Sequence, residues 1–362
     1  MKHTCLTGVL GFIGMSLLSS TLHAAEPATQ AVPTTQAATQ PEVRRGVPQL
    51  GRADPRNQLQ YFDRLTRMAE PTGTPTVARL PAYIELFKRE FVDDARRFVF
   101  EVKAQQGGEA VELSGYVWLE EHRNALAMWI ERMGLGPVKS SIVALPEAGV
   151  PPVARLTGDA FFYDVPAAVD GRRRETVTQN VAGDLVFPLS QPRNDHMLVM
   201  GSDGYIGWVA AEMLSPIGPS TLATALPPPD MAVVNLAIAS AKSILGTPYV
   251  WGGTTGKGID CSGLMQRSYR AAGINLPRDA DQQSQVGRLT AVRHARAGLG
   301  AGDLLFFVGR RGSINHVGMY LGENQFIEAV DEGVKISSFN PADANYDAAR
   351  DKGFVLAKRV TE

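Results

Sequence analysis

The chain has 362 residues, and its 36 lysines and arginines against 37 aspartates and glutamates give a formal charge of −1 at pH 7. This balance excludes the broad basic surface with which proteins bind nucleic acids or anionic membranes. The sequence contains two cysteines, Cys5 and Cys261. Cys5 lies in a stretch that is expected to be removed, so the remaining chain can form no internal disulfide.

The first 24 residues have the pattern of a secretory signal peptide. A basic start is followed by an apolar stretch from Leu6 to Leu18 and by small residues at Ala24 and Ala25. The apolar stretch is shorter than the about 17–25 residues that a membrane-spanning helix needs. We therefore expect cleavage near Ala24 and export to the periplasm or to the extracellular cell wall, with no membrane partner after removal.

Residues 25–58 are expected to form a disordered linker. They are rich in Ala, Thr, Gln and Pro and contain few branched or aromatic apolar side chains. Such a segment cannot bury enough apolar surface to offset the entropy lost on ordering.

Residues 59–148 are expected to form a small α+β module. Apolar side chains at helical spacing predict a helix that faces a core: Tyr83, Ile84, Phe87 and Phe91. Between Phe98 and Ala144 the pattern then predicts strand, strand, helix and strand. His122 lies on the polar flank of that helix and is expected at the surface.

Residues 149–226 show the short alternating runs and the Pro, Asn, Asp and Gly turns of an all-β domain. The hairpin sequence GYIGWV, which includes Trp208, resembles bacterial SH3-like domains. This resemblance implies a small β-barrel in which Trp208 belongs to the core. The proline-rich segment 225–230 is expected to act as a stiff spacer.

Residues 227–362 contain the candidate catalytic side chains. Asp230 is placed to cap an apolar helix, and a second helix is predicted from Cys261 to Ala272. Cys261 then lies in the first turn of a helix, where the macrodipole favours an anion. We expect this position to lower the thiol pKa below its usual value of about 8.5.

A predicted hairpin over residues 315–330 brings a base toward that cysteine. With a three-residue turn, Leu321 pairs with Gln325, and His316 and Glu328 share one face of the sheet. A two-residue turn would place His316 and Glu328 on opposite faces. We therefore expect the turn of odd length.

The motifs of this region occur in a specific order: PYVWGG, DCSGLMQRSYRAAGINLPRDADQQ, GAGDLLFF and HVGMYLGENQFIEA. On these motifs the last third of the chain resembles the NlpC-type cell-wall peptidases, which are papain-like cysteine enzymes with helices packed on an antiparallel sheet. The resemblance implies that Cys261 is the nucleophile, His316 the general base, Glu328 the residue that orients the histidine, and Tyr249 a hydroxyl near the oxyanion. The family more often has His, Asn or Gln in the third place, so Glu328 is a departure that puts the pH optimum in doubt.

The resemblance also suggests residues that contact substrate. Family members that trim stem peptides with a free amino terminus use the residues matching Asp260 and Ser262 to hold that terminus, although Asp260 alone could equally cap the helix. Arg278 either meets a substrate carboxylate or closes a surface ion pair. Trp251 lies in the same motif as Tyr249, and we expect it to contact substrate as well.

The implied reaction is hydrolysis of the amide between γ-D-glutamate and a diamino acid such as diaminopimelate, through a cysteine thioester. Peptidoglycan stem peptides or muropeptides would then be the partners, and no cofactor is implied. No metal is implied either, because the six histidines show no ligand spacing. Two alternatives stay open, a wall-binding scaffold with an inactive peptidase fold and a related amidase or acyltransferase.

Overall fold

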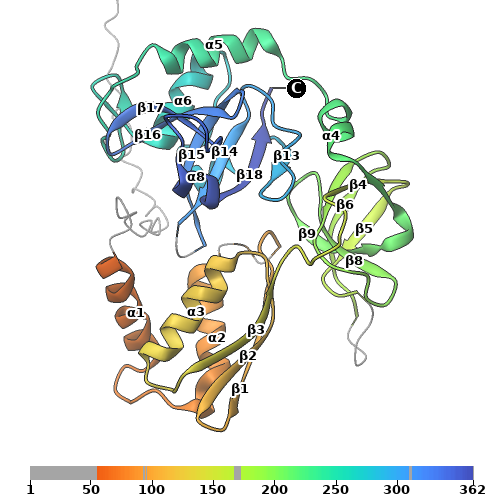
Figure 1. Cartoon of the computed structure of the whole chain (residues 1–362), viewed down its shortest axis with the longest axis vertical. Coiled ribbons are helices and arrows are strands. Elements are labelled where there is room, and N and C mark those ends of the chain that lie inside the picture. The colour runs from red at the N-terminus through yellow and green to blue at the C-terminus, as the bar shows by residue number, and fades with distance from the viewer. Residues whose placement is uncertain (1–54, 93, 95, 167–172, 310–311, 362) are drawn as a thin grey trace, which may run out of the picture. The chain divides into compact units, whose positions relative to one another are not determined.

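A computed structural model describes residues 55–92, 94, 96–166, 173–309 and 312–361 (Figure 1). The expected signal peptide (1–24) lies outside the described residues, and so does the expected linker (25–58) up to residue 54. Helix α1 (Pro55–Ala69) begins inside the linker range. The prediction of a linker is therefore wrong for its last four residues.

The first module contains these helices and strands: α1, η1 (Val77–Arg79), α2 (Leu80–Phe91), β1 (Phe100–Gly107), β2 (Ala110–Val117), α3 (Glu120–Arg132) and β3 (Val138–Ala144). The predicted order of strand, strand, helix and strand after residue 98 is confirmed. Strands β1 and β2 pair antiparallel, whereas β3 joins β2 in parallel after the crossover helix α3. The apolar face of α2 is buried as its spacing predicts.

The prediction for His122 is wrong, because this residue is fully buried rather than at the surface. Helix α3 turns it toward the rings of Phe98 and Phe100, with centroids 6.3 and 6.0 Å away. Its Nε2 lies 3.3 Å from the backbone oxygen of Phe91. Burial lowers the pKa of His122 to about 4, so the ring is neutral at pH 7.

The second region is built from short strands, as the turn-rich sequence predicts: β4 (Val153–Leu156), β5 (Ala160–Tyr163), β6 (Thr176–Asn180), β7 (Leu185–Pro188), β8 (His196–Met200), β9 (Ile206–Ala210) and β10 (Leu214–Ile217), with the short helix η2 (Ala211–Met213). They form one sheet in the order β10-β4-β7-β8-β9-β5-β6. Trp208 is 5% exposed, in agreement with a place in the core. The assignment to SH3-like domains stays a prediction, and helix α4 (Pro219–Ala225) follows this region.

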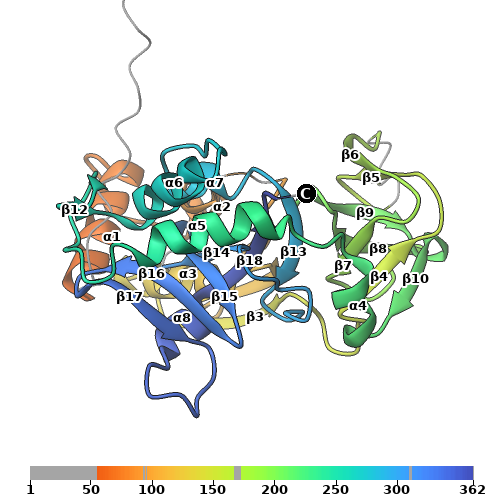
Figure 2. The same ribbon diagram turned by 90° about the horizontal axis from the view of Figure 1, so that it is seen from above.

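The C-terminal part consists of helices on an antiparallel sheet, as expected. Its elements are α5 (Met231–Lys242), β11 (Thr254–Thr255), β12 (Gly258–Ile259), α6 (Cys261–Ala271), α7 (Ala280–Gln283), β13 (Arg288–Val292), β14 (Leu304–Val308), β15 (Ile314–Gly322), β16 (Gln325–Val330), β17 (Gly333–Ser338), α8 (Ala348–Gly353) and β18 (Phe354–Arg359). The six main strands follow the order β13-β18-β14-β15-β16-β17, and every pair is antiparallel. Helix α6 packs against α5 and against β15, and α7 also contacts β15 (Figures 1 and 2).

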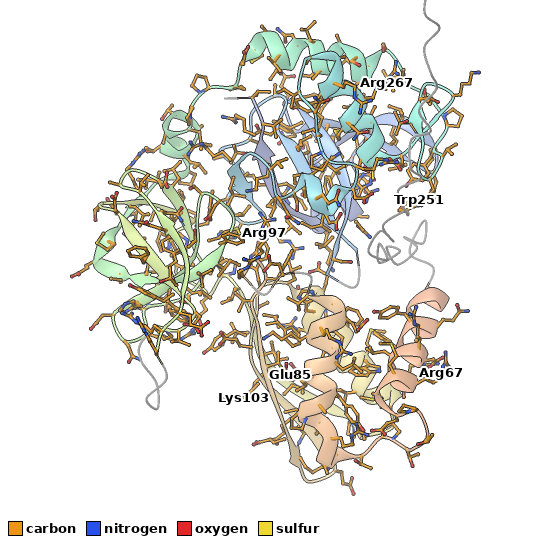
Figure 3. All side chains as sticks on the ribbon, turned by 180° about the vertical axis from the view of Figure 1, so that it is seen from behind. Arg67, Glu85, Arg97, Lys103, Trp251 and Arg267 are labelled. Carbon is orange, nitrogen blue, oxygen red and sulfur yellow. The ribbon has the colours of Figure 1, made fainter. Side chains whose placement is uncertain are left out.

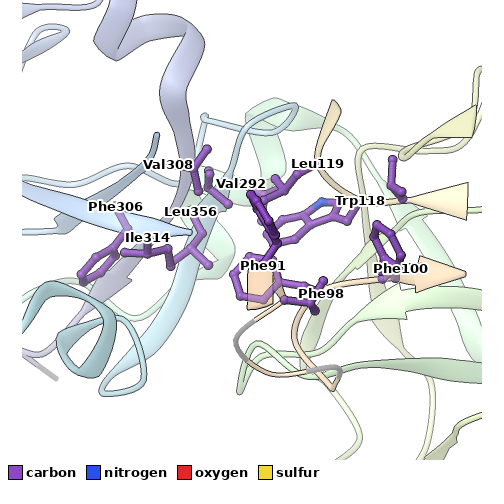
Figure 4. Packing of buried hydrophobic residues seen from close by; sticks show 14 of the residues in the cluster. Phe91, Phe98, Phe100, Trp118, Leu119, Val292, Phe306, Val308, Ile314 and Leu356 are labelled. Carbon is purple, nitrogen blue, oxygen red and sulfur yellow. The ribbon is translucent and has the colours of Figure 1, made fainter. Parts of the chain in front are cut away.

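The first module and the C-terminal part share one buried apolar cluster. Phe98 and Trp118 of the first module belong to the same cluster as Val292, Ile314 and Leu356 (Figure 4). Burial of apolar surface on both sides stabilises this junction. Within the described ranges, no helix has the length and apolarity required to cross a bilayer.

Candidate active site

Cys261 begins helix α6, as the sequence predicts. Asp260 is the N-cap residue, and its Oδ1 accepts a hydrogen bond from the backbone N–H of Gly263 at 2.7 Å. This bond satisfies one of the N–H groups that the first turn of a helix leaves without an intrahelical acceptor. The start of the helix, and with it the position of the sulfur, is thereby fixed.

The thiol pKa differs from the expectation. Cys261 is 4% exposed, and burial raises its pKa to about 11. The backbone N–H groups of Val317 and Ser262 and the charge of Arg350 act in the opposite direction but do not outweigh burial. The prediction of a lowered pKa is wrong, because it counted the helix terminus and left out desolvation. Cys261 is a neutral thiol at pH 7.

His316 and Glu328 are brought together on neighbouring strands. His316 on β15 lies with its Nε2 2.7 Å from Oε2 of Glu328 on β16. Both side chains are buried, at 7% and 0% exposure. The backbone N–H of Val317, the next residue in β15, acts on the thiol of Cys261 by lowering its pKa, and helix α6 contacts β15. The imidazole therefore belongs to the strand segment that contacts the thiol.

The turn that sets this register differs from the predicted one. It has two central residues, Glu323 and Asn324, with φ of 52° and 64°, and Gly322 pairs with Gln325. Two successive positive φ angles are typical of a tight type I′ hairpin. A bulge at Leu321 adds one residue to β15, between the pairs of Tyr320 and Gly322. This extra residue shifts the pairing by one position, as the expected three-residue turn would have done. His316 and Glu328 therefore still lie on the same face of the sheet.

Glu328 accepts hydrogen bonds on both of its oxygens. Besides His316, the Oγ of Ser337 donates to Oε1 at 2.6 Å, and Nε of Arg350 donates to Oε2 at 2.8 Å. Burial opposes ionisation, but the bonds from His316 and Ser337 and the charge of Arg350 outweigh it and lower the pKa of Glu328 to about 2. Glu328 is therefore an anion at pH 7.

His316 is shifted toward its neutral form. Burial is the largest cause of its lowered pKa, followed by the positive charge of Arg350, whereas the bond to Glu328 acts in the opposite direction. A neutral imidazole with Nε2 bound to a carboxylate carries its proton on that nitrogen. Its Nδ1 then carries a lone pair and is the nitrogen that can accept a proton.

Tyr249 lies beside the segment that leads into α6, in a bridge with Ile259. Burial raises the pKa of Tyr249 above the usual value, and the negative charge of Asp260, together with that of Cys261 where the thiol is ionised, adds to this effect. The phenol is therefore protonated and lies close to both groups. It can donate a hydrogen bond to an oxyanion formed near the sulfur.

Asp260, Ser262 and Arg278 form one hydrogen-bonded cluster. Arg278 donates from both Nη atoms to the two oxygens of Asp260, at 3.0 and 2.5 Å, and from Nη1 to Oγ of Ser262 at 2.9 Å. Asp260 also accepts from the N–H of Gly252 at 2.9 Å. The capping interpretation of Asp260 is confirmed, and Arg278 closes an ion pair with it. A substrate ammonium at Asp260 would have to compete with this guanidinium.

Trp251 lies one residue before Gly252, on the outer side of the same loop. It is 58% exposed, and its indole lies at the edge of the C-terminal part (Figure 3). Exposure of so large an apolar side chain is compatible with contact to a substrate. Among the residues that the structure describes, no cluster of three His, Cys, Asp or Glu side chains could hold a metal ion.

Sequence reasoning missed Ser337 and Arg350. Glu328 pairs with Lys335 across β16 and β17, so Ser337 lies two residues further along the same face, and this alternation was a usable signal. Arg350 lies in a charged segment between β17 and β18 and has no comparable signal in the sequence. Both residues act on Glu328, which the motifs do identify.

A scan against family models matches residues 246–349 to the NlpC/P60 family. Residues 246–349 form an NlpC/P60 domain. The match covers the helix of Cys261 and the strands of His316 and Glu328.

Curated relatives match over the same region. The gamma-D-glutamyl-L-lysine dipeptidyl-peptidase of Bacillus cereus is 42% identical over 25% of this chain and 27% of its own length. The murein DD-endopeptidase MepS/murein LD-carboxypeptidase of Escherichia coli K12 is 46% identical over 26% of this chain and 49% of its own length. The chain thus spans between about a quarter and a half of these two relatives. A crystal structure of an NlpC/P60 family protein from Bacillus cereus is 27% identical and covers 59% of this chain and 64% of its own, at a TM-score of 0.32.

Proposed function

We propose that this chain is an exported cysteine peptidase that hydrolyses peptidoglycan stem peptides at the amide between γ-D-glutamate and a diamino acid. The observation that carries the proposal is the buried bond of 2.7 Å between His316 and Glu328, on the strand that contacts the thiol of Cys261. A wall-binding module has no need for a neutral imidazole, a carboxylate and a thiol in one buried place. The names of the relatives support a cell-wall peptide substrate.

The first half of the reaction forms a thioester. His316 accepts the thiol proton of Cys261 while the sulfur attacks the carbonyl carbon of the glutamyl amide. The negative charge that develops on the carbonyl oxygen is met by the backbone N–H of Cys261 and by the hydroxyl of Tyr249. The protonated imidazole, stabilised by Glu328, then gives its proton to the amine of the diamino acid as the C–N bond breaks.

The second half returns the enzyme to its starting state. A water molecule gives a proton to His316 and attacks the thioester carbonyl. The C–S bond breaks, the sulfur regains a proton from the imidazole, and a carboxylic acid leaves. No net charge or electron is left on the protein.

The substrate bond can be tested directly, because the names of the two relatives point to different bonds. The purified chain is incubated with L-Ala-γ-D-Glu-diaminopimelate, with the same peptide blocked at its amino terminus, and with a D,D-cross-linked muropeptide dimer. Mass spectrometry of the products is expected to show release of diaminopimelate from the first two. Cleavage of the dimer alone would contradict the proposed bond, and tight wall binding without any cleavage would favour the scaffold.

A further inference from the structure

Arg350 contacts Glu328 from a third element, helix α8. Its Nε lies 2.8 Å from the same oxygen, Oε2, that accepts the bond from His316. The guanidinium carbon lies 5.6 Å from the ring centroid of Phe307. Helix α8 is itself fixed by Asp347, whose Oδ1 accepts from the N–H of Arg350 at 3.0 Å. The arginine is thus held on both its backbone and its side chain.

A buried carboxylate beside a histidine would by itself favour the imidazolium, because no water screens the two charges. An imidazolium cannot accept the thiol proton of Cys261. The guanidinium of Arg350 supplies the opposing charge, and the pair formed by Glu328 and Arg350 is neutral overall. Glu328 then keeps its hydrogen bond to His316 without forcing a proton onto it.

We infer that Arg350 is a positioning residue that neutralises Glu328, so that His316 rests as the unprotonated base of this site. The inference rests on the proposed function for its catalytic meaning, but the effect on His316 is a property of the protein alone. Among the residues that the structure describes, the charged groups that act most strongly on His316 are Glu328 on β16, Arg350 on α8 and Asp347, the N-cap residue of α8. Asp347 favours the imidazolium, as Glu328 does, so Arg350 is the cation among them that opposes it.

The test compares three variants of the full chain. Arg350→Gln removes the positive charge. Arg350→Lys keeps the positive charge but lacks the planar guanidinium group. Arg296→Gln is the matched control, because Arg296 also ties α8 to the sheet, through the backbone oxygen of Asp351 at 2.8 Å and the rings of Phe339 and Phe354. Arg296 is not among the hydrogen-bond partners of Glu328.

The primary measurement is the titration of the His316 ring by NMR, which needs no substrate. Loss of a neighbouring cation is expected to move the titration midpoint up by about one pH unit in Arg350→Gln. Arg350→Lys and Arg296→Gln are expected to stay near the wild-type midpoint. The acid limb of kcat/KM should move with the midpoint of each variant, because catalysis needs the neutral ring.

Two results would overturn the inference. One is an unchanged midpoint in Arg350→Gln, which would make the arginine merely structural. The other is an equal rise in the Lys or Arg296 variant, which would show that the charge on Glu328 is not what sets the midpoint. If Arg350→Gln does not fold, Arg350→Lys keeps the inference falsifiable, because a midpoint that rises in a variant that retains the cation would contradict it. A shifted midpoint in a chain that cleaves no peptide would support the electrostatic inference and count against the proposed function.

Discussion

Cys261 and His316 both carry pKa shifts that favour their uncharged forms. Burial raises the pKa of the thiol to about 11 and lowers that of the imidazole below its usual value. The resting pair is therefore a thiol and a neutral imidazole, and the proton moves as the sulfur attacks. Acceleration must then come from positioning and from hydrogen bonds to the oxyanion, rather than from a preformed thiolate.

The hydroxyl of Tyr249 gives this argument a test. Tyr249→Phe removes one candidate oxyanion donor and leaves the thiol and imidazole in place. Removal of such a donor typically costs about 10²-fold in kcat. We expect a loss of this order with the tripeptide substrate, measured beside the rate at which iodoacetamide alkylates Cys261. Alkylation should stay at the wild-type rate, and an equal loss of both rates would instead assign Tyr249 to activation of the thiol.

At this scale the sequence predicts which residues meet but not how they titrate. Motif order identifies Cys261, His316 and Glu328, and the structure brings the last two into a hydrogen bond. The thiol pKa and the burial of His122 were predicted wrongly, because both depend on desolvation by residues far away in the chain. Arg350 was missed because its partner, Glu328, precedes it by 22 residues, so that no local pattern in the sequence links the two.

Two helices in the C-terminal part begin with an aspartate as the N-cap residue. Asp230 caps α5 by accepting from the N–H groups of Ala232 and Val233, and Asp260 caps α6. The two caps differ in surroundings, because Asp260 also holds Arg278 and lies next to the thiol.

These caps allow a matched comparison. Asp230→Ala is expected to lower the free energy of unfolding by about 1 kcal/mol, as loss of a helix cap does, and to keep activity. Asp260→Ala should lower the free energy of unfolding by more, because it also leaves Arg278 without its carboxylate, and it should reduce activity strongly. Urea denaturation and peptide hydrolysis measure the two effects. Equal losses of activity in both variants would contradict a special role for the α6 cap.

The hairpin of β15 and β16 illustrates what element patterns can and cannot predict. Alternation along the strands and the need for a shared face predict the correct register for His316 and Glu328. The device that produces it, a two-residue turn with a bulge at Leu321, was not predicted. Either device yields the same offset, so the sequence pattern alone does not separate them.

Three regions of the chain meet at a buried lysine. Lys358 of β18 donates to the backbone oxygens of Asp203 and Gly287. Arg97, labelled in Figure 3, donates to those of Asp203 and Ser284. Burial and the charge of Arg97 lower the pKa of Lys358 to about 7. The contact joins the first module, the second region and the C-terminal part through hydrogen bonds from two cationic side chains to backbone oxygens.

This shift predicts how stability depends on pH. In the unfolded chain a lysine keeps its proton up to about pH 10.4, so between pH 7 and that value the unfolded state binds more protons than the folded one. Stability should therefore rise with pH, by about 2 kcal/mol from pH 7 to pH 9. Differential scanning calorimetry is expected to show this as a higher Tm at pH 9.

A variant tests whether Lys358 causes the expected rise in Tm. Lys358→Met should abolish the rise in Tm between pH 7 and pH 9. Lys335→Met is the control, since Lys335 is a partly exposed lysine of β17 that pairs with Glu332, and it should keep the rise. A wild-type Tm that is flat over this range would contradict the lowered pKa.

For the whole molecule, the order of the elements was largely predicted, because periodicity and turn residues are local signals. The strand, strand, helix and strand order of the first module and the antiparallel C-terminal sheet agree with expectation. The junction of Phe98 and Trp118 with Val292 and Leu356 was not predicted, since contacts between regions leave no periodic signal in a single sequence. Export and the SH3-like assignment stay predictions.

The measurement that tests the central claim most directly is hydrolysis of L-Ala-γ-D-Glu-diaminopimelate by Cys261→Ala beside the wild-type chain. Equal unfolding transitions would first establish that both proteins are folded. The account predicts that the wild-type chain releases diaminopimelate and that the variant, which lacks the sulfur, releases none above background. Undiminished hydrolysis by Cys261→Ala would contradict the claim that this thiol is the nucleophile.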